Sequence, residues 1–364
     1  MNIMANPSFH TLTVKDIKQE TKSCVSVAFA IPTALQNEFT YEAGQYITLK
    51  TDINGEEIRR SYSLCSSPLE SDFRVAIKLI RGGKFSTYAN HDLKVGDTLD
   101  VMTPMGNFTT QLDATHSKQY MAFAAGSGIT PMMSLIKTVL ASESNSSFTL
   151  VYGNQNFYSI IFREELEALK NMYLGRFQII HLLSRERMET DLNYGRINAD
   201  KCQQLFAKMI DVNTIDQFFL CGPEDMIMSV KSYLESNHVN TDKIHFELFT
   251  SDSSAKAKEA FQEAHKEDLG KVSIVTIKVD DRSFEIPLAY GGETILDAAL
   301  KHGADLPFAC KGGVCCTCRA KVTEGTVEME VNYALEKEEV ANGFVLSCQA
   351  HPTSERVVID FDAR

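Results

Sequence analysis

The sequence lacks the features that mark several broad classes of protein. It contains no stretch approaching the roughly 18 consecutive apolar residues of a membrane-spanning helix, so we expect no membrane span. The first twenty residues, MNIMANPSFHTLTVKDIKQE, show no basic segment followed by an apolar run and predict no secretory signal. The 36 basic and 48 acidic residues include no basic block, and the net charge of −12 argues against nucleic-acid binding, which needs clustered cations.

Motifs of several kinds of catalytic site are also missing. The nine His residues form neither an H-x3-H nor an H-E-x2-H pattern, so no zinc or di-iron site within the chain is indicated. There is no G-x-S-x-G nucleophile motif and no internal repeat. What is present is an ordinary globular composition, with 44% hydrophobic and 23% charged residues over 364 positions, which indicates two or three domains.

The pattern of apolar residues divides the chain into successive blocks. Residues 1–113 contain short alternating apolar runs separated by Gly and Asn turns, which is typical of an antiparallel β-barrel or sandwich. Residues 114–250 alternate strand-like and helical segments joined by short loops, which predicts a doubly wound parallel sheet.

The remaining residues form a linker and a third block. Residues 251–270 contain no β-branched residue and predict a solvated, partly helical linker, with a surface helix of the second block as the alternative. Residues 271–364 return to short strands, with helices predicted at Thr294–Lys301 and near Tyr333–Ala341. This last block carries 10 basic and 15 acidic residues, a net charge of −5.

The nine cysteines give the strongest functional signal, because four of them fall within nine residues. Clustered cysteines in a chain without a secretory signal favour a metal or redox site over disulfides, and they favour a cytoplasmic protein. The spacing C-x4-C-x2-C, followed after 29 residues by one more cysteine, is the plant-type spacing of a [2Fe–2S] cluster. The predicted ligands are Cys310, Cys315, Cys318 and Cys348, and Cys316 falls off the spacing.

The residues between the cysteines agree with this interpretation. Gly312 and Gly313 allow the backbone to curl around a cluster and to point N–H groups at its sulfur atoms. The alternative is a zinc ribbon, but such sites usually carry two C-x2-C pairs and only one is present here. The segment PFACKGGVCCTCRAKV, with VLSCQ after it, resembles a plant-type ferredoxin domain, most closely that of the reductase subunits of phenylacetyl-CoA epoxygenases. The resemblance implies an α+β β-grasp fold for residues 271–364.

Two motifs in the first block indicate a flavin site. Arg60-Ser61-Tyr62-Ser63 ends a predicted turn, and a Gly82-Gly83-Lys84-Phe85-Ser86-Thr87 segment follows some 20 residues later. Arg60 can pair with a pyrophosphate, and glycines and hydroxyls at a predicted helix start can cradle phosphate. With the ferredoxin motif downstream, the pair resembles the flavin-binding barrel of the ferredoxin–NADP reductase superfamily. That resemblance implies FAD bound by Arg60, Ser61, Tyr62, Ser63, Gly83, Lys84, Phe85 and Ser86. Related reductases of the same domain order hold FMN, which stays as the alternative.

The second block contains a dinucleotide motif. The strand YMAFAA is followed by Gly126-Ser127-Gly128-Ile129-Thr130-Pro131, where glycines allow a pyrophosphate to approach a helix N-terminus. This G-x-G-x-x-P form is the one that the superfamily shows, and it implies a nicotinamide cofactor bound by Gly126, Gly128, Thr130 and Pro131. Cys221-Gly222-Pro223 ends a later strand at the carboxyl edge, where ligands bind in such sheets. Taken alone, Cys221 is a buried apolar cysteine; the resemblance implies that it lies beside the nicotinamide.

Further residues bear on which nicotinamide is used. Ser184 and Arg185 follow the strand FQIIHLL and can clasp a 2′-phosphate, with Arg196 as a second candidate, so we predict NADPH rather than NADH. The alternative is a solvated charged loop. Glu247 lies in the segment that closes the block, and the resemblance implies that it approaches the flavin together with Ser63 and Cys221 as a catalytic residue.

The resemblance covers nearly the whole chain and implies an electron-transfer oxidoreductase. NADPH would reduce FAD, and the [2Fe–2S] cluster would pass single electrons to a separate acceptor. By resemblance the acceptor is an oxygenase component, a multisubunit di-iron enzyme that epoxidises phenylacetyl-CoA in phenylacetate catabolism. Another di-iron monooxygenase, a ring hydroxylase or a desaturase is the alternative acceptor. A zinc-binding module without enzymatic activity is the remaining alternative.

Overall fold

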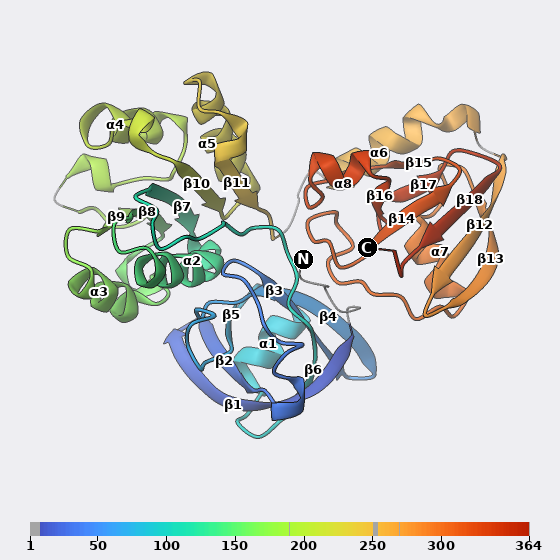
Figure 1. The fold of residues 1–364 in the computed structure, drawn as a ribbon, viewed down its shortest axis with the longest axis horizontal. Coiled ribbons are helices and arrows are strands. Elements are labelled where there is room, and N and C mark those ends of the chain that lie inside the picture. The colour runs from blue at the N-terminus through green and yellow to red at the C-terminus, as the bar shows by residue number, and fades with distance from the viewer. Residues whose placement is uncertain (1–7, 189, 250–253, 269, 364) are drawn as a thin grey trace. The chain divides into compact units, whose positions relative to one another are not determined.

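The computed structural model describes residues 8–188, 190–249, 254–268 and 270–363 (Figure 1). The chain forms two compact units. One comprises Phe9–Pro104 and Phe108–Leu248, and the other contains Met105–Asn107 and the described residues from Phe249 onward. Among the described residues, every helix is too short or too polar to cross a bilayer.

The first unit opens with a curled antiparallel sheet of six strands. These are β1 (Phe9–Thr21), β2 (Cys24–Ala30), β3 (Tyr46–Ile53), β4 (Glu56–Ser63), β5 (Arg74–Lys78) and β6 (Thr98–Met102), in the order β4-β3-β6-β1-β2-β5. Leu64, directly after β4, bridges Val75 of β5, and the N–H of Cys65 donates to the Arg74 carbonyl at 2.9 Å. Because these contacts join the two edges of the sheet, it closes into the predicted barrel. Helix α1 (Lys84–His91) inserts the buried Phe85 into its core.

One local prediction in the barrel is wrong. We expected Arg60-Ser61-Tyr62-Ser63 to end a turn, but these residues lie within strand β4. The turn comes earlier, at Asn54-Gly55, where both residues have positive φ angles of 58° and 80°. The strand EEIRRSYS is strongly polar, and only three of its residues are buried. A strand of this composition does not show the clear alternation that reveals a half-buried strand.

A parallel sheet with covering helices completes the first unit. Its strands are β7 (Gln119–Ala125), β8 (Ser147–Asn154), β9 (Phe177–Leu183), β10 (Gln217–Cys221) and β11 (Ile244–Glu247), in the order β11-β10-β7-β8-β9. The helices are α2 (Ile129–Ser142), α3 (Arg163–Met172), α4 (Ala199–Lys208) and α5 (Glu224–Ser236). All neighbouring strands pair in parallel, which confirms the predicted doubly wound sheet. The direction of winding reverses between β7 and β10, and ligands bind such sheets at that point, beyond the carboxyl ends of the strands.

The other unit contains a mixed sheet. Its strands are β12 (Val272–Val279), β13 (Arg282–Ala289), β14 (Arg319–Glu324), β16 (Phe344–Leu346) and β18 (Arg356–Asp360), in the order β13-β12-β18-β14-β16, and β15 (Val327–Met329) pairs with β17 (Ala350–Pro352). Helix α7 (Ile295–Lys301) begins where the Thr294 side chain accepts a hydrogen bond from the Asp297 N–H. Helix α8 (Lys337–Ala341) is shorter than predicted. A mixed sheet with one main helix confirms the α+β class predicted for this part.

The predicted linker over 251–270 includes a helix, α6 (Ser254–Ala264). The Phe261 ring of α6 is buried and stacks between His265 at 4.1 Å and His351 of β17 at 4.5 Å, measured between ring centroids. Helix α6 therefore packs on the unit that contains the mixed sheet. Its single aromatic side chain, Phe261, buries its apolar ring in that contact. Residues 250–253 and 269 lie outside the described residues.

Short 3-10 turns occupy several of the connections. They are η1 (Thr33–Leu35), η2 (Gly126–Gly128), η3 (Phe157–Ser159), η4 (Asp191–Asn193), η5 (Val212–Thr214), η6 (Thr241–Lys243) and η7 (Lys266–Asp268). The second of these carries the predicted dinucleotide motif from β7 into α2.

Candidate functional site

The three residues predicted to be catalytic lie together where the barrel meets the parallel sheet. Cys221, the last residue of β10, pairs with Glu247 of β11 on one side and with Ala124 of β7 on the other. Ser63, the last residue of β4, donates a hydrogen bond to Glu247 Oε2 at 2.9 Å. The end of a barrel strand thus reaches the carboxyl edge of the parallel sheet at β11, one strand away from the reversal point.

The environment of this group sets its protonation. Desolvation raises the pKa of Glu247 from its usual 4.5 to about 7, and the hydrogen bond from Ser63 lowers it only in part. Glu247 can therefore hold or release a proton near neutral pH. Burial raises the pKa of the Cys221 thiol well above its ordinary value, with the nearby Glu247 carboxylate acting in the same direction. Cys221 is therefore a neutral thiol that offers a compact apolar contact and no nucleophilic thiolate.

Two glycines allow the loops after β7 and β10 to meet. A Cβ atom on Gly128 would lie 2.0 Å from the carbonyl oxygen of Cys221. A Cβ on Gly222 would lie 2.7 Å from Met226 Cε and 3.2 Å from Ala125 Cβ. The sequence suggested glycines here for the approach of a ligand; the structure adds that the two loops need them in order to pack against each other.

The loop that follows β7 is held in place by polar contacts. The Tyr152 hydroxyl donates to the Gly126 carbonyl at 2.9 Å, and Thr130 Oγ1 donates to the Ser127 carbonyl at 3.0 Å. Pro131 lies in the first turn of α2, as predicted. A Cβ on Gly126 would lie 2.9 Å from Lys78 Nζ.

The ammonium group of Lys78 is thus placed over the predicted pyrophosphate loop, from the last residue of β5. Sequence reasoning missed this residue. The sequence shows only that a lysine ends the apolar strand RVAIK. It does not show that this end of the strand lies next to the Gly126 loop of the parallel sheet.

The two predicted flavin segments are neighbours in the barrel. The Tyr62 ring lies 5.6 Å from the Phe85 ring of α1, with the planes tilted by 39°. Arg60 is exposed, and its Nη1 donates to the Arg59 carbonyl at 2.7 Å. The Ser61 hydroxyl lies 3.1 Å from that of Thr48 in β3.

The glycine segment before α1 is arranged differently from the prediction. Gly83 caps the helix with an extended conformation. The Ser86 hydroxyl accepts a hydrogen bond from the Ile80 N–H at 3.1 Å and donates to the Gly83 carbonyl at 3.2 Å. Lys84 forms an ion pair with Glu56. The hydroxyl therefore shapes the loop itself, and the N–H groups in the first turn of the helix can meet an anion.

The residues predicted to read the 2′-phosphate extend the end of β9. The N–H groups of Ser184 and Arg185 donate to the carbonyls of Asn154 and Gln155 at 2.9 and 2.8 Å. The Arg185 side chain is exposed. The segment before Arg196 returns to the same place, because Gly195 N donates to the Leu183 carbonyl at 3.0 Å. Both arginines thus adjoin the carboxyl end of one strand.

The four predicted ligand cysteines form one group within the other unit. The Sγ atoms of Cys310 and Cys315 are 3.0 Å apart, and the Cys348 thiol is hydrogen-bonded to both Cys310 and Cys318. Among the described residues, no three His, Cys, Asp or Glu side chains are arranged around a common position for a single metal ion. None of the described cysteines forms a disulfide.

The backbone around the cysteines fits an iron–sulfur group. The N–H of Gly312 donates to Cys310 Sγ at 3.3 Å. Hydrogen bonds from the Cys315 and Cys348 thiols, together with this N–H, lower the pKa of Cys310. Gly313 has a φ of +73°, and a Cβ there would lie 2.8 Å from Val331 Cγ2. Four cysteine sulfurs, with a backbone N–H aimed at one of them, are a donor set that fits such a cluster.

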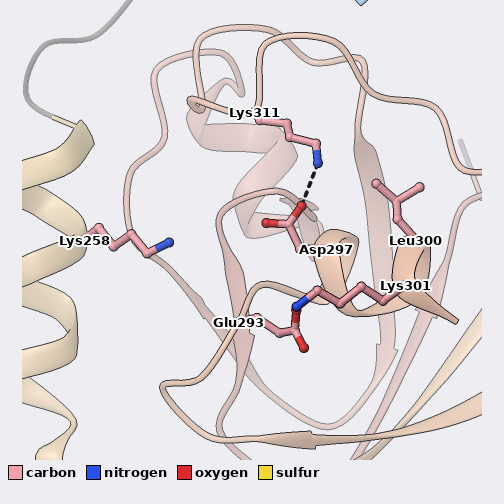
Figure 2. A pocket seen from close by; sticks show the side chains of 6 residues that line it. All are labelled: Lys258, Glu293, Asp297, Leu300, Lys301 and Lys311. Carbon is pink, nitrogen blue, oxygen red and sulfur yellow. Dashed lines mark hydrogen bonds and ion pairs between the residues drawn. The ribbon is translucent and has the colours of Figure 1, made fainter. Parts of the chain in front are cut away.

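A hollow of about 480 Å³ lies beside the cysteine loop (Figure 2). Its polar lining is largely paired within itself: Lys311 Nζ lies 2.7 Å from Asp297 Oδ1, and Lys301 Nζ lies 2.5 Å from Glu293 Oε2. Lys258 of α6 and Leu300 of α7 complete the wall. The paired charges leave little net field for an ionic ligand.

Comparisons with known proteins follow the same division of the chain. Three family models match in succession: the oxidoreductase FAD-binding domain at residues 11–110, the oxidoreductase NAD-binding domain at 123–232, and the 2Fe-2S iron-sulfur cluster binding domain at 277–353. The chain is 44% identical to one subunit of the 1,2-phenylacetyl-CoA epoxidase of Escherichia coli (strain K12), over 98% of this chain and 99% of that one. This chain belongs to the ferredoxin–NADP reductase superfamily, in the group with a C-terminal [2Fe–2S] domain.

Other relatives and structures agree with this assignment. The chain is 32% identical to the ferredoxin reductase component of 3-ketosteroid-9-alpha-monooxygenase from Rhodococcus rhodochrous, over 96% of each chain. The solved structure of phthalate dioxygenase reductase shares its fold, with a TM-score of 0.58 and 22% identity over 97% of this chain and 98% of that one. A type IV self-sufficient cytochrome P450 monooxygenase has a TM-score of 0.70 at 22% identity, over 96% of this chain and 41% of that one.

The superfamily assignment confirms the predicted activity and cofactors at the level of class. This reductase is an NAD(P)H-dependent oxidoreductase that uses FAD and a [2Fe–2S] cluster. The alternative of a structural zinc module is therefore wrong, since a matching iron–sulfur domain covers all four cysteines.

Proposed function

We propose that this reductase takes electrons from NADPH and delivers them to a multisubunit di-iron oxygenase that acts on phenylacetyl-CoA. The observation that carries the proposal is the 44% identity to the Escherichia coli 1,2-phenylacetyl-CoA epoxidase component, along nearly the full length of both chains. The reductases of 3-ketosteroid and glycine betaine monooxygenases reach 32% and 30%. A different oxygenase partner is the second candidate, because those relatives also match most of the chain.

The proposal assigns each cofactor to residues of this chain. FAD would be held by Arg60, Ser61, Tyr62, Ser63, Gly83, Lys84, Phe85 and Ser86, within residues 1–113. NADPH would be held by Gly126, Gly128, Thr130, Pro131, Ser184, Arg185, Arg196, Cys221, Gly222 and Pro223, within 114–250. The cluster would be held by Cys310, Cys315, Cys318 and Cys348, within 271–364, after a linker at 251–270. We add Lys78 as a partner of the NADPH pyrophosphate, because its ammonium group lies over the Gly126 loop.

Three residues would act where nicotinamide and flavin meet. When bound, FAD accepts a hydride and releases electrons singly to the [2Fe–2S] group. The Ser63–Glu247 hydrogen bond joins the barrel to the parallel sheet and supports a carboxyl group whose pKa is about 7. This carboxyl can hold or release a proton at neutral pH. The neutral Cys221 thiol would pack beside the nicotinamide and exclude water.

The choice of NADPH rests on Ser184 and Arg185. Their N–H groups are fixed by the end of β8, so their side chains project from an ordered strand end. An arginine there can form paired hydrogen bonds with a 2′-phosphate. We also propose a cytoplasmic location, because cysteine thiols that ligate iron are kept reduced in that compartment.

The experiment that tests the proposal is NADPH oxidation by the purified reductase mixed with an oxygenase component. The mixture is assayed with the phenylacetyl-CoA oxygenase or with the 3-ketosteroid oxygenase, each with and without its substrate. The proposal expects NADPH consumption that requires both the phenylacetyl-CoA oxygenase and the thioester. Equal or greater stimulation by the 3-ketosteroid pair would assign the reductase to another partner.

A further inference from the structure

A glutamine beside the cysteine group has the geometry of a donor to the cluster. Gln349 follows Cys348 directly and is 3% exposed. Its Nε2 lies 2.8 Å from the Cys348 carbonyl oxygen, 3.1 Å from the Lys311 carbonyl oxygen and 3.5 Å from Cys348 Sγ. Two of these neighbours are pure acceptors, so exchanging the amide oxygen and nitrogen would set oxygen against oxygen. The donor orientation is therefore fixed by the surroundings.

The other end of the amide makes this arrangement costly. In the described part of the chain, Gln349 Oε1 is buried with no hydrogen-bond partner. Burying an unsatisfied carbonyl destabilises the folded state, and an apolar side chain of the same length would avoid that cost. We infer that the N–H groups of the Gln349 amide, and not its oxygen, are the reason for a glutamine at this position.

The contacts of Gln349 reach both cysteine-bearing segments. Lys311 lies in the loop between Cys310 and Cys315, whereas Cys348 comes from a separate segment that leads into β17. The backbone of Gln349 is also fixed, because its carbonyl accepts from the Glu330 N–H at 2.9 Å. One buried amide thus ties the ligand loop to the last ligand.

We propose that Gln349 is a positioning residue that raises the reduction potential of the [2Fe–2S] group, because one of its two amide N–H hydrogens is shared between a backbone carbonyl and the Cys348 sulfur. Reduction adds one electron and breaks no covalent bond, and a donor at a ligand sulfur stabilises the more negative, reduced state. The inference rests on the proposed cysteine ligands.

The test is a potentiometric titration of the full-length holoprotein, with the reduced cluster followed by its paramagnetic resonance signal. Gln349→Met keeps the length and burial of the side chain and removes the donor. We expect the ratio of reduced to oxidised cluster at a fixed potential to fall about tenfold, which is a midpoint lower by about 59 mV. Val331→Ala is the matched control, because Val331 packs on the same loop at Gly313 and donates no side-chain hydrogen bond. An unchanged midpoint in Gln349→Met, or an equal fall in Val331→Ala, would overturn the inference.

A second measurement uses the wild-type protein and does not depend on how the variant folds. Glutamine labelled with ¹⁵N in its side chain is incorporated, and the hyperfine spectrum of the reduced cluster is recorded. A ¹⁵N coupling is the expected result, and its absence refutes the donor role. Both measurements use chemical reductants and mediators, so they are independent of NADPH and of the acceptor. A wild-type protein without any cluster signal would instead contradict the proposed function.

Discussion

Replacing Glu247 by Gln should change how the stability of the first unit depends on pH. In the folded protein the pKa of Glu247 is about 7, against 4.5 when it is exposed. Between these values the unfolded chain releases the proton while the folded chain keeps it, so the free energy of unfolding falls as pH rises. Each pKa unit corresponds to about 1.36 kcal/mol, so the wild type should lose at most about 3 kcal/mol between pH 4.5 and 7. A glutamine carries no such proton, and its amide oxygen can still accept from Ser63.

The measurement is urea unfolding of the FAD-loaded chain, followed by release of flavin fluorescence, at half-unit steps from about pH 5 to pH 8, the range around the shifted pKa. The Glu247→Gln variant should gain stability relative to the wild type as pH rises toward 7, and the difference should then level off. Glu164→Gln, which alters an exposed carboxylate at the start of α3, is the control and should follow the wild-type profile. Parallel profiles for the wild type and Glu247→Gln would show that this carboxyl is not desolvated, and the reasoning would fail.

Three further substitutions test other parts of the site. Gly128→Ala places a Cβ 2.0 Å from a backbone oxygen, so it should lower the free energy of unfolding of the first unit by about 3 kcal/mol and impair flavin reduction. Gly175→Ala is the control: its Cβ meets open space, so in the same unfolding assay it should cost about 1 kcal/mol. Cys315→Ser should abolish the cluster signal and acceptor reduction while NADPH still bleaches the flavin; joint loss of both steps would show that the domains are not independent. Arg185→Ala should raise the Michaelis constant for NADPH far more than that for NADH, and equal effects on the two would remove the 2′-phosphate assignment.

The spacing of residues along the chain predicted the fold class and the cofactor classes. The cysteine spacing predicted the kind of cofactor, because a plant-type [2Fe–2S] domain carries its cysteines at fixed offsets, and a model of such a domain matches residues 277–353. The order of strands and helices after residue 114 works because a parallel sheet requires crossover helices. The G-x-G-x-x-P motif predicted the start of α2, with Pro131 in its first turn.

The features that sequence reasoning missed depend on contacts between distant segments. The sequence predicts that residues 60–63 end a turn, whereas they form the end of strand β4. The prediction is wrong because β4 is polar and lacks the alternation of apolar and polar residues that reveals a strand. The position of Lys78 over the Gly126 loop joins residues from different sheets, and no local pattern encodes it. The burial of Phe261 in α6 depends on its contact with the distant His351, so composition alone predicts a solvated segment there.

We propose that this one chain carries electrons from NADPH through FAD to the [2Fe–2S] cluster. The most direct test is to mix the purified protein with NADPH without oxygen or acceptor, and to follow flavin absorbance together with the paramagnetic signal of the reduced cluster. We expect the flavin to bleach first and the cluster signal to appear afterwards, while part of the flavin absorbance returns. A bleached flavin with a cluster that stays oxidised, or a cluster that is reduced before the flavin, would contradict it.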